Sequence, residues 1–275
     1  MPARPLFIGG TSANSGKSWM ATAICAWLRR QGVAVAPFKA QNMSNNSYPC
    51  AGGGEIGRAQ VVQAEACGLE PEPAMNPILL KPTGERTSQV VVNGKPHSVM
   101  SAVEYHAAKP ALRALVLDAL ADLRTRFDEV ICEGAGSPAE INLLEHDIVN
   151  LRIAHDAGLP AVLVGDIDLG GVFAALYGTV GLLPDHLRAL VQGFIINKLR
   201  GDPALLADAG ADLERRCGVP TIGVLPWLPD LRLDAEDSVA LLQPWLHHDE
   251  HDGDLLDIAV IGLPRISNFT DLDPL

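Results

Sequence analysis

The stretch from Leu6 to Ser18 limits the folds open to this chain more than any other part of the sequence. It reads Leu-Phe-Ile-Gly-Gly-Thr-Ser-Ala-Asn-Ser-Gly-Lys-Ser. Its apolar start predicts a short buried strand, its small residues predict a tight loop, and the Gly-Lys-Ser end opens a helical pattern. We expect this helix to bury one apolar face that consists of Met20, Ile24, Trp27 and Leu28.

This strand, loop and helix predict a phosphate cradle. Backbone N–H groups and the positive helix end would face an oligophosphate, Lys17 would reach its outer phosphates, and the Ser18 hydroxyl would ligate Mg²⁺. The common pattern G-x-x-x-x-G-K-[ST] has glycine where this chain has Thr11, so a chance Gly-Lys-Ser after an ordinary strand and turn is the alternative. The residues expected at the nucleotide are Thr11, Asn14, Ser15, Gly16, Lys17 and Ser18.

Composition narrows the class of protein. The 275 residues suffice for one large α/β domain or two small ones, with 48% hydrophobic and 20% charged residues. A net charge of −12 argues against general binding of nucleic acid or anionic membranes, which need an accumulated positive field. The five cysteines form no C-x-x-C pair, which favours neither a disulfide framework nor a zinc site. Without a long apolar run, the sequence predicts a soluble cytoplasmic protein.

Apolar runs alternate with helical patterns along most of the chain, which predicts a P-loop fold with a doubly wound, mostly parallel sheet covered on both faces. Ser101 and Glu104 predict a capping box, and Pro110 predicts a kink or two separate helices. The predicted strands after the first are 33–38, 129–133, 161–165, 193–196 and 221–225, and the predicted helices after the first are 55–66, 101–127, 143–157, 171–182 and 204–217.

Two segments do not fit the alternation of strand and helix. The run from Lys39 to Ser47 is densely polar, so we predict a loop rather than part of the core. Residues 75–95 are rich in Pro and Gly with one β-like run at 89–92, and they predict an inserted excursion outside the main sheet.

Polar residues follow several predicted strands, at the edge where ligands of parallel sheets bind. Glu133 would place a carboxylate there for Mg²⁺, although a buried structural Glu is the alternative. Asp166 and Asp168 would ligate metal or orient a nucleophile, or else cap the next helix. Lys39 would neutralise a transferring phosphoryl group, with a surface salt bridge as the alternative.

The pair Asn197-Lys198 resembles the base-reading pair of some nucleotide-binding folds, which is a weak signal because two residues alone carry it. Together these features predict a Mg-nucleotide-dependent domain for phosphoryl transfer or ligation. They do not name its substrate.

Several longer runs match one family. They are PFKAQNMS at 37–44, GGEIGRAQ at 53–60, MNPILLKP at 75–82, EGAGSP at 133–138, DIVN at 147–150, GDID at 165–168 and GGVF at 170–173. With these runs the chain resembles the cobyric acid synthases, glutamine-dependent amidases of the cobalamin pathway, over essentially residues 4 to 275. The wider dethiobiotin-synthetase-like group shares the phosphate loop, whereas the runs at 37–44 and 75–82 point to this member.

The resemblance implies an enzyme that uses ATP and Mg²⁺ to phosphorylate the b, d, e and g carboxylates of adenosylcobyrinic acid a,c-diamide. Ammonia derived from glutamine would convert the acyl phosphates to amides. On this basis Lys17 and Lys39 steady the phosphates, Ser18 and Glu133 hold Mg²⁺, and Asp166 or Asp168 organises metal or substrate. The residues expected to contact the polycarboxylate corrin are Gln41, Asn42, Ser44, Ser47, Arg58 and Lys81.

The chain also departs from the family pattern. The family often has an acid where this chain has Asn14 and a basic residue where it has Leu169, which would weaken metal or anion binding. The resemblance implies a synthetase domain at 1–229, an acidic linker at 230–254 and the opening of a class I glutamine amidotransferase domain at 255–275. The His-rich run at 247–252 suggests metal binding, but a solvated linker is the better interpretation.

No cysteine lies beyond Cys217, so we expect that this chain does not supply the glutaminase site itself. It would be a fragment, a truncated product or half of a split enzyme, and whether a separate glutaminase partner exists stays open. An inactive, poorly folding fragment is one alternative, because a strand at 255–261 would lack a partner, and removing residues after about 254 should then improve solubility.

Membership of another branch of the same superfamily is a further alternative. A dethiobiotin synthetase or a cobyrinic acid a,c-diamide synthase would share the phosphate loop and differ in substrate. A ParA- or MinD-like ATPase would carry a lysine early in the phosphate loop, where this chain has Gly9, Gly10 and Thr11.

Overall fold

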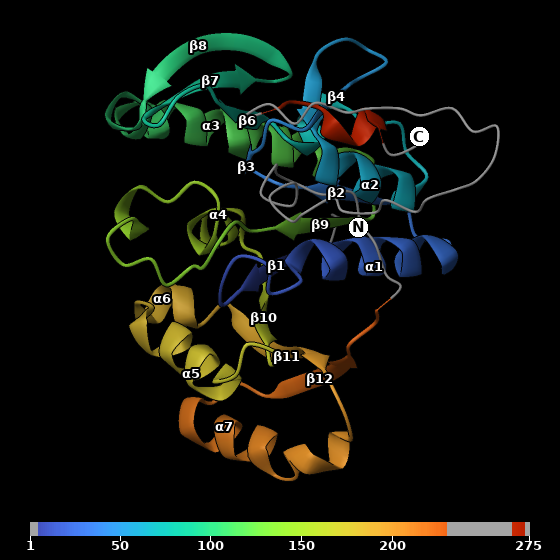
Figure 1. Cartoon of the computed structure of the whole chain (residues 1–275), viewed down its shortest axis with the longest axis vertical. Helices are drawn as coiled ribbons and strands as arrows, with labels where there is room; N and C mark the ends of the chain where they lie inside the picture. The colour runs from blue at the N-terminus through green and yellow to red at the C-terminus, as the bar shows by residue number, and fades with distance from the viewer. Residues whose placement is uncertain (1–4, 230–265, 273–275) are drawn as a thin grey trace, which may run out of the picture.

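The computed structural model describes residues 5–229 and 266–272, and a six-stranded parallel sheet lies at its centre (Figure 1). Its strand order is β12-β11-β10-β1-β9-β2, and every neighbouring pair is parallel. The predicted α/β fold with a mostly parallel sheet is therefore confirmed. The strands are β1 (Leu6–Gly10), β2 (Val35–Phe38), β9 (Glu129–Glu133), β10 (Ala161–Asp166), β11 (Val191–Leu199) and β12 (Thr221–Pro226).

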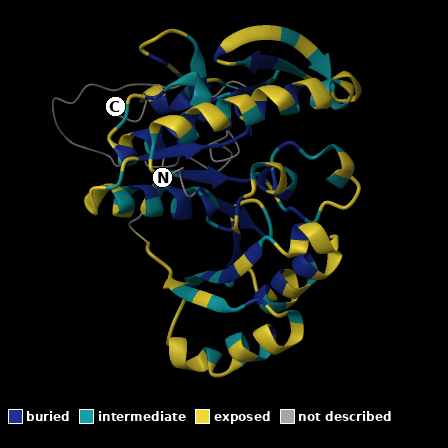
Figure 2. Ribbon diagram, turned by 180° about the vertical axis from the view of Figure 1, so that it is seen from behind, coloured by how far each residue is buried: buried dark blue, intermediate teal, exposed yellow. Residues whose placement is uncertain are grey.

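Helices cover both faces of this sheet. Alternate residues of β1 point to opposite faces, so Ile8 packs on the side of α1 while Phe7 packs with the buried residues of α3, α4 and α5. Figure 2 shows the central strands of the sheet mostly buried, its edge strand β12 intermediate to exposed, and the outer faces of the helices exposed. The helices are α1 (Lys17–Arg30), α2 (Arg58–Cys67), α3 (Ala102–Arg126), α4 (Leu151–Ala157), α5 (Val172–Leu182), α6 (Asp185–Arg188) and α7 (Ala209–Cys217).

The predicted buried face of α1 is only partly right. Met20 is buried and Ile24 and Leu28 pack against the core, but Trp27 is 59% exposed. The stripe that faces the sheet is centred on Ala21, and Trp27 follows it by six residues, which at 3.6 residues per turn places it roughly 120° away.

Three predicted helices have different bounds. The helix predicted at 55–66 begins only at Arg58, because Glu55–Gly57 forms β5 and pairs with β4 (Ser47–Pro49). The helix predicted at 143–157 is a 3-10 turn, Leu144–His146, followed by α4, and the one predicted at 204–217 is a 3-10 turn, Pro203–Leu206, followed by α7.

The long helix α3 confirms one prediction and excludes one of the two alternatives that Pro110 left open. The Ser101 hydroxyl accepts a hydrogen bond from the Glu104 N–H, and the Glu104 carboxylate accepts one from the Ser101 N–H, so the capping box is present. Two separate helices do not form, because α3 continues through Pro110 over 25 residues. Pro110 is exposed, so its ring lies where the packed face of the helix is not disturbed.

The excursion predicted at 75–95 does leave the main sheet, and it forms a sheet of its own. Strands β6 (Ile78–Pro82), β7 (Thr87–Val92) and β8 (Lys95–Ser101) pair antiparallel, and β3 (Gln41–Met43) pairs parallel to β6. The β-like run at 89–92 lies within β7.

The prediction of an exposed loop at 39–47 is wrong. Lys39, Asn42, Ser44 and Asn46 are buried, and the segment contributes β3 and the start of β4. Polar side chains are tolerated there because they bond within the protein: Asn42 Nδ2 donates to Gln60 Oε1 at 3.1 Å, for example.

The segment 266–272, which contains the 3-10 turn Phe269–Leu272, contacts this same polar run. The Asn268 Oδ1 atom accepts hydrogen bonds from the N–H and the hydroxyl of Ser47 at 3.0 and 3.3 Å. The Thr270 hydroxyl donates to Asn46 Oδ1 at 2.9 Å. The linker predicted at 230–254, its His-rich run and the strand predicted at 255–261 all lie outside the described residues. Within 5–229 and 266–272, no helix is both long and apolar enough to cross a membrane.

We expect Asn268→Gly to lower the free energy of unfolding by about 1–2 kcal/mol, because two hydrogen bonds to the Ser47 region are lost. Glycine is the suitable replacement, since Asn268 has a φ of 51° that alanine would not tolerate well. Thermal unfolding measures the effect, with the exposed neighbour variant Asp271→Ala as the control. Equal melting temperatures for the two variants would contradict the assigned contact.

Candidate active site

The phosphate loop lies between β1 and α1 and depends on two glycines. A Cβ on Gly10 would lie 2.2 Å from Ser15 Oγ. Gly16 has a φ of 101°, and a Cβ added there would lie 2.1 Å from Asn197 Nδ2. Lys17, which begins α1, is buried and donates from Nζ to the Ser12 carbonyl at 2.7 Å and to the Gly136 carbonyl at 3.1 Å. The loop is thus held in a closed turn by its small residues.

Residues at the carboxyl end of β11 contact the phosphate loop, at the sheet edge that the sequence predicted, while base reading by this pair stays a prediction. Asn197 Nδ2 donates to the Ser15 carbonyl at 3.0 Å, and Lys198 Nζ donates to the Asn14 carbonyl at 2.7 Å. Lys198 also pairs with Asp166 on the neighbouring strand β10 at 2.6 Å. Both residues of the predicted pair therefore bind the loop backbone, which fixes its position relative to the sheet.

Glu133, the last residue of β9, is the centre of the site. It is 2% exposed, and its Oε1 atom accepts from the Ser18 hydroxyl at 2.7 Å and from Lys39 Nζ at 3.0 Å. The structure thus brings together three residues predicted from three separate segments. Lys39 does not form the alternative surface salt bridge, because its ion pair with Glu133 is buried.

Sequence reasoning missed one member of this cluster. Gln63 on α2 is fully buried, and its Nε2 donates to Glu133 Oε2 at 2.5 Å. A second buried glutamine, Gln60, lies one turn earlier on the same helix and contacts Asn42 instead. The available signal was two glutamines spaced i, i+3 in a helix whose other polar residues are only Arg58 and Glu65, which places both glutamines on one face.

The residues present fit a magnesium nucleotide. The Ser15 hydroxyl is buried in the phosphate loop and has no hydrogen-bond partner in the described part of the chain. Because buried polar groups are normally hydrogen-bonded, a bound phosphate would supply the missing partner. The Ser18 hydroxyl and the Glu133 carboxylate lie 2.7 Å apart, and oxygen donors of these two kinds suit Mg²⁺. Lys17 supplies a cation beside the same loop.

The structure separates Asp166 and Asp168, which were predicted to act at one place. Asp166 is buried, pairs with Lys198 and accepts from the Asp168 N–H at 2.9 Å, so it lies in the network around the phosphate loop. Asp168 pairs with Arg200 at 2.6 Å, and the Arg200 guanidinium lies 3.9 Å from the centre of the Trp227 ring. Neither caps α5, whose N-cap Gly171 has no side-chain hydrogen bond.

The residues predicted to contact substrate fall into two groups. Gln41, Asn42 and Ser44 bond within the protein: Gln41 accepts from the Tyr105 hydroxyl, Asn42 bonds Gln60, and Ser44 donates to the Asn46 carbonyl at 3.2 Å.

The second group lies nearer the surface. Ser47 and Lys81 share the Glu55 carboxylate, which accepts from the Ser47 hydroxyl at 2.7 Å and pairs with Lys81 at 2.6 Å. The Arg58 guanidinium lies 5.2 Å from the centre of the Tyr48 ring. Contact of either group with substrate remains a prediction.

Comparison with known proteins places this chain in a family. A family model described as CobQ/CobB/MinD/ParA nucleotide binding domain matches residues 6–240. Cobyric acid synthases are 54% identical in Saccharopolyspora erythraea and 51% in Frankia casuarinae, each over 98% of this chain and 53% and 56% of the relative. That of Thermosynechococcus vestitus is 51% identical over 100% of this chain and 55% of the relative.

The chain thus spans about half the length of these curated relatives. Among solved structures, FtsY from Elizabethkingia anophelis has a TM-score of 0.48 at 15% identity over 80% of this chain and 58% of that chain, too distant to support a functional conclusion. The resemblance drawn from the sequence motifs is confirmed: the chain belongs to the CobQ/CobB/MinD/ParA nucleotide-binding domain family, and within it to the relatives named cobyric acid synthase.

Proposed function

We propose that this chain is the ATP-dependent, amide-forming part of a cobyric acid synthase. The observation that carries the proposal is the buried cluster in which Glu133 joins Ser18 of the phosphate loop to Lys39. The relatives named cobyric acid synthase, about half identical over nearly the whole chain, support the substrate class. On this proposal the substrate is adenosylcobyrinic acid a,c-diamide, and its b, d, e and g carboxylates become amides.

The proposed reaction needs a carboxylate to be activated, because a carboxylate is a poor acyl donor until one oxygen becomes a leaving group. Mg-ATP supplies the phosphoryl group when bound. Ser18 and Glu133 would hold Mg²⁺, and Lys17 and Lys39 would balance the negative charge that gathers on the phosphates. Ammonia then displaces phosphate from the activated carboxyl carbon, leaving an amide.

The ammonia is proposed to come from glutamine, hydrolysed on a glutaminase that is separate from the described residues. Free ammonium at high concentration would replace it. Asp166 is proposed to act indirectly, through Lys198 and the loop backbone, whereas Asp168 lies in an ion pair farther along the edge.

Mass spectrometry of the corrin diamide incubated with this chain, Mg-ATP and either ammonium or glutamine tests the proposal. We expect successive mass changes of one amidation each with ammonium and none with glutamine. No amidation from a folded chain that binds Mg-ATP would refute the proposed substrate. A ParA- or MinD-like ATPase would hydrolyse ATP in this assay without changing the corrin.

Gln63→Leu is expected to reduce the amidation rate about tenfold or more and to raise the Mg²⁺ concentration for half-maximal rate. The reason is that Glu133 Oε2 loses its amide donor and the carboxylate is no longer fixed for the metal. Gln60→Leu is the matched control, because Gln60 is equally buried on α2 but contacts Asn42. Magnesium titration of both variants and thermal unfolding separate the two effects. An identical Mg²⁺ requirement in both variants would make Gln63 a purely structural residue.

A further inference from the structure

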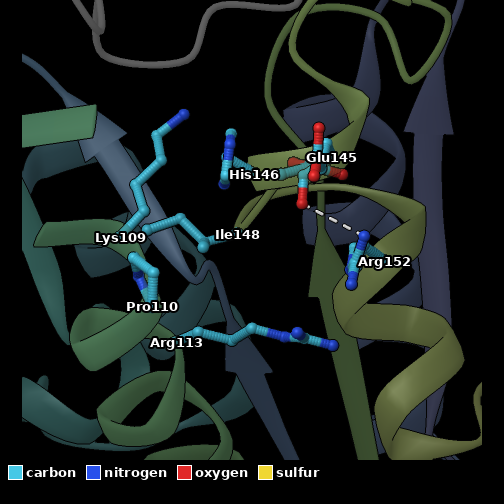
Figure 3. A pocket seen from close by; sticks show the side chains of 8 residues that line it. Lys109, Pro110, Arg113, Glu145, His146, Ile148 and Arg152 are labelled. Carbon is cyan, nitrogen blue, oxygen red and sulfur yellow. Dashed lines mark hydrogen bonds between the residues drawn. The ribbon is translucent and has the colours of Figure 1, made fainter. Parts of the chain in front are cut away.

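A polar cavity lies between α3 and the segment that leads into α4. Its volume is about 260 Å³. Figure 3 shows Arg113 reaching from α3 toward Arg152 of α4, with Lys109 and His146 above them. The lining residues are Lys109, Pro110, Arg113, Glu145, His146, Asp147, Ile148 and Arg152.

Three cations gather in this cavity although the whole chain carries a net charge of −12. Burial lowers the pKa of Lys109, and burial together with the nearby Arg152 lowers the pKa of Arg113. In both cases the charged form is disfavoured by its surroundings, which an anion in the cavity would reverse.

The acidic groups of the cavity do not neutralise these cations completely. Asp147 accepts hydrogen bonds from the N–H groups of Val149 and Asn150, and burial raises its pKa. Glu145 is exposed, and its contact with Arg152 is through its backbone carbonyl at 3.1 Å.

Two hydrogen-bond donors at the cavity lack a partner among the described residues. Arg113 pairs with Asp156 outside the lining, yet its Nε is buried without a hydrogen-bond partner in the described part of the chain. Among the described residues, the Lys109 ammonium has no hydrogen-bond or ion-pair partner. An oxyanion in the cavity would give the Lys109 ammonium a partner.

Two walls of the cavity belong to segments that also contact the active site. Lys109 lies one helical turn after Tyr105, whose hydroxyl donates to Gln41, just beyond Lys39. On the other wall, Asn150 bonds both the N–H and the carbonyl of Ala135, in the loop that follows Glu133. The cavity walls are therefore tied through hydrogen bonds to the loop after Glu133 and to the segment after Lys39.

We propose that this cavity is a subsite for a carboxylate of the corrin substrate other than the one being activated, with Lys109 and Arg152 as its principal ligands. This rests on the proposed function. A single negative charge suits the cavity better than a phosphate dianion, because Glu145 and Asp147 would repel the second charge. Pro110 and Ile148 supply apolar surface for the methylene groups of a carboxyalkyl side chain.

Calorimetric titration of the purified chain with adenosylcobyrinic acid a,c-diamide tests the subsite. We expect Lys109→Ala and Arg152→Ala each to weaken corrin binding roughly 10- to 100-fold, as is typical for loss of a hydrogen bond to a charged group, and Lys109→Glu to weaken it further. The matched control is Lys95→Ala, which removes an exposed lysine of β8 and should leave corrin binding unchanged. Affinity for a fluorescent ATP analogue should stay the same in all four variants.

The outcomes separate the subsite from the proposed function. Equal corrin binding by the wild type and Lys109→Glu would overturn the subsite and leave the proposed function standing. A wild-type chain that binds the ATP analogue but no corrin would overturn the proposed substrate and the subsite with it. Lys109-dependent binding of inorganic phosphate that does not compete with the corrin would overturn the assignment to a substrate carboxylate.

Discussion

Replacing Glu133 by glutamine is expected to lower the amidation rate roughly 10²- to 10³-fold, the loss typical of removing one preorganised electrostatic group. The same change should reduce the free energy of unfolding by about 3–5 kcal/mol, because the Lys39 ammonium stays buried without this carboxylate. Activity is measured by mass spectrometry of the corrin, and stability by denaturant unfolding. Retained activity would mean that Glu133 is only a structural residue.

The double variant Glu133→Gln with Lys39→Met separates the two effects. Removing both charges takes away a buried cation that has lost its Glu133 carboxylate, so much of the lost stability should return. The amidation rate should stay low, because neither the proposed metal ligand nor the second cation is present. Recovery of activity together with stability would show that the single variant failed only by unfolding.

Replacing Gly16 by alanine is expected to weaken binding of an ATP analogue by at least roughly 100-fold. The backbone at Gly16 has a φ of 101°, and an added Cβ would lie 2.1 Å from Asn197 Nδ2. Backbone strain of this kind costs about 1–3 kcal/mol, and relief of the clash would move the loop from the position that Asn197 holds through the Ser15 carbonyl. Fluorescence titration and thermal unfolding measure the two consequences.

Gly32→Ala is the matched control for this variant. Gly32 also has a positive φ, of 78°, but nothing lies within 4 Å of an added Cβ. We expect a stability loss of about 1 kcal/mol from the backbone alone and unchanged nucleotide affinity. If both variants bind the analogue with wild-type affinity, the loop at Gly16 does not cradle the nucleotide.

The sequence determined those features that follow from local pattern. Strand, loop and helix around the phosphate loop were predictable because apolar periodicity and small residues encode them over a few positions. The common edge of Glu133, Asp166, Asn197 and the phosphate loop was predictable as well, because parallel strands bring their carboxyl ends to one edge of a sheet.

Only the tertiary structure decided how polar residues are used in the interior. The run from Lys39 to Ser47 is polar enough to predict a loop, yet it is largely buried, because Gln60, Glu133 and Asn268 supply its partners from distant segments. The hydrogen bond between Gln63 and Glu133 could not be predicted for the same reason, because no local pattern shows which amide will contact a buried carboxylate. Hydrophobic periodicity is a local property of the sequence, whereas the hydrogen-bond partners of buried polar groups come together only when remote segments pack against each other.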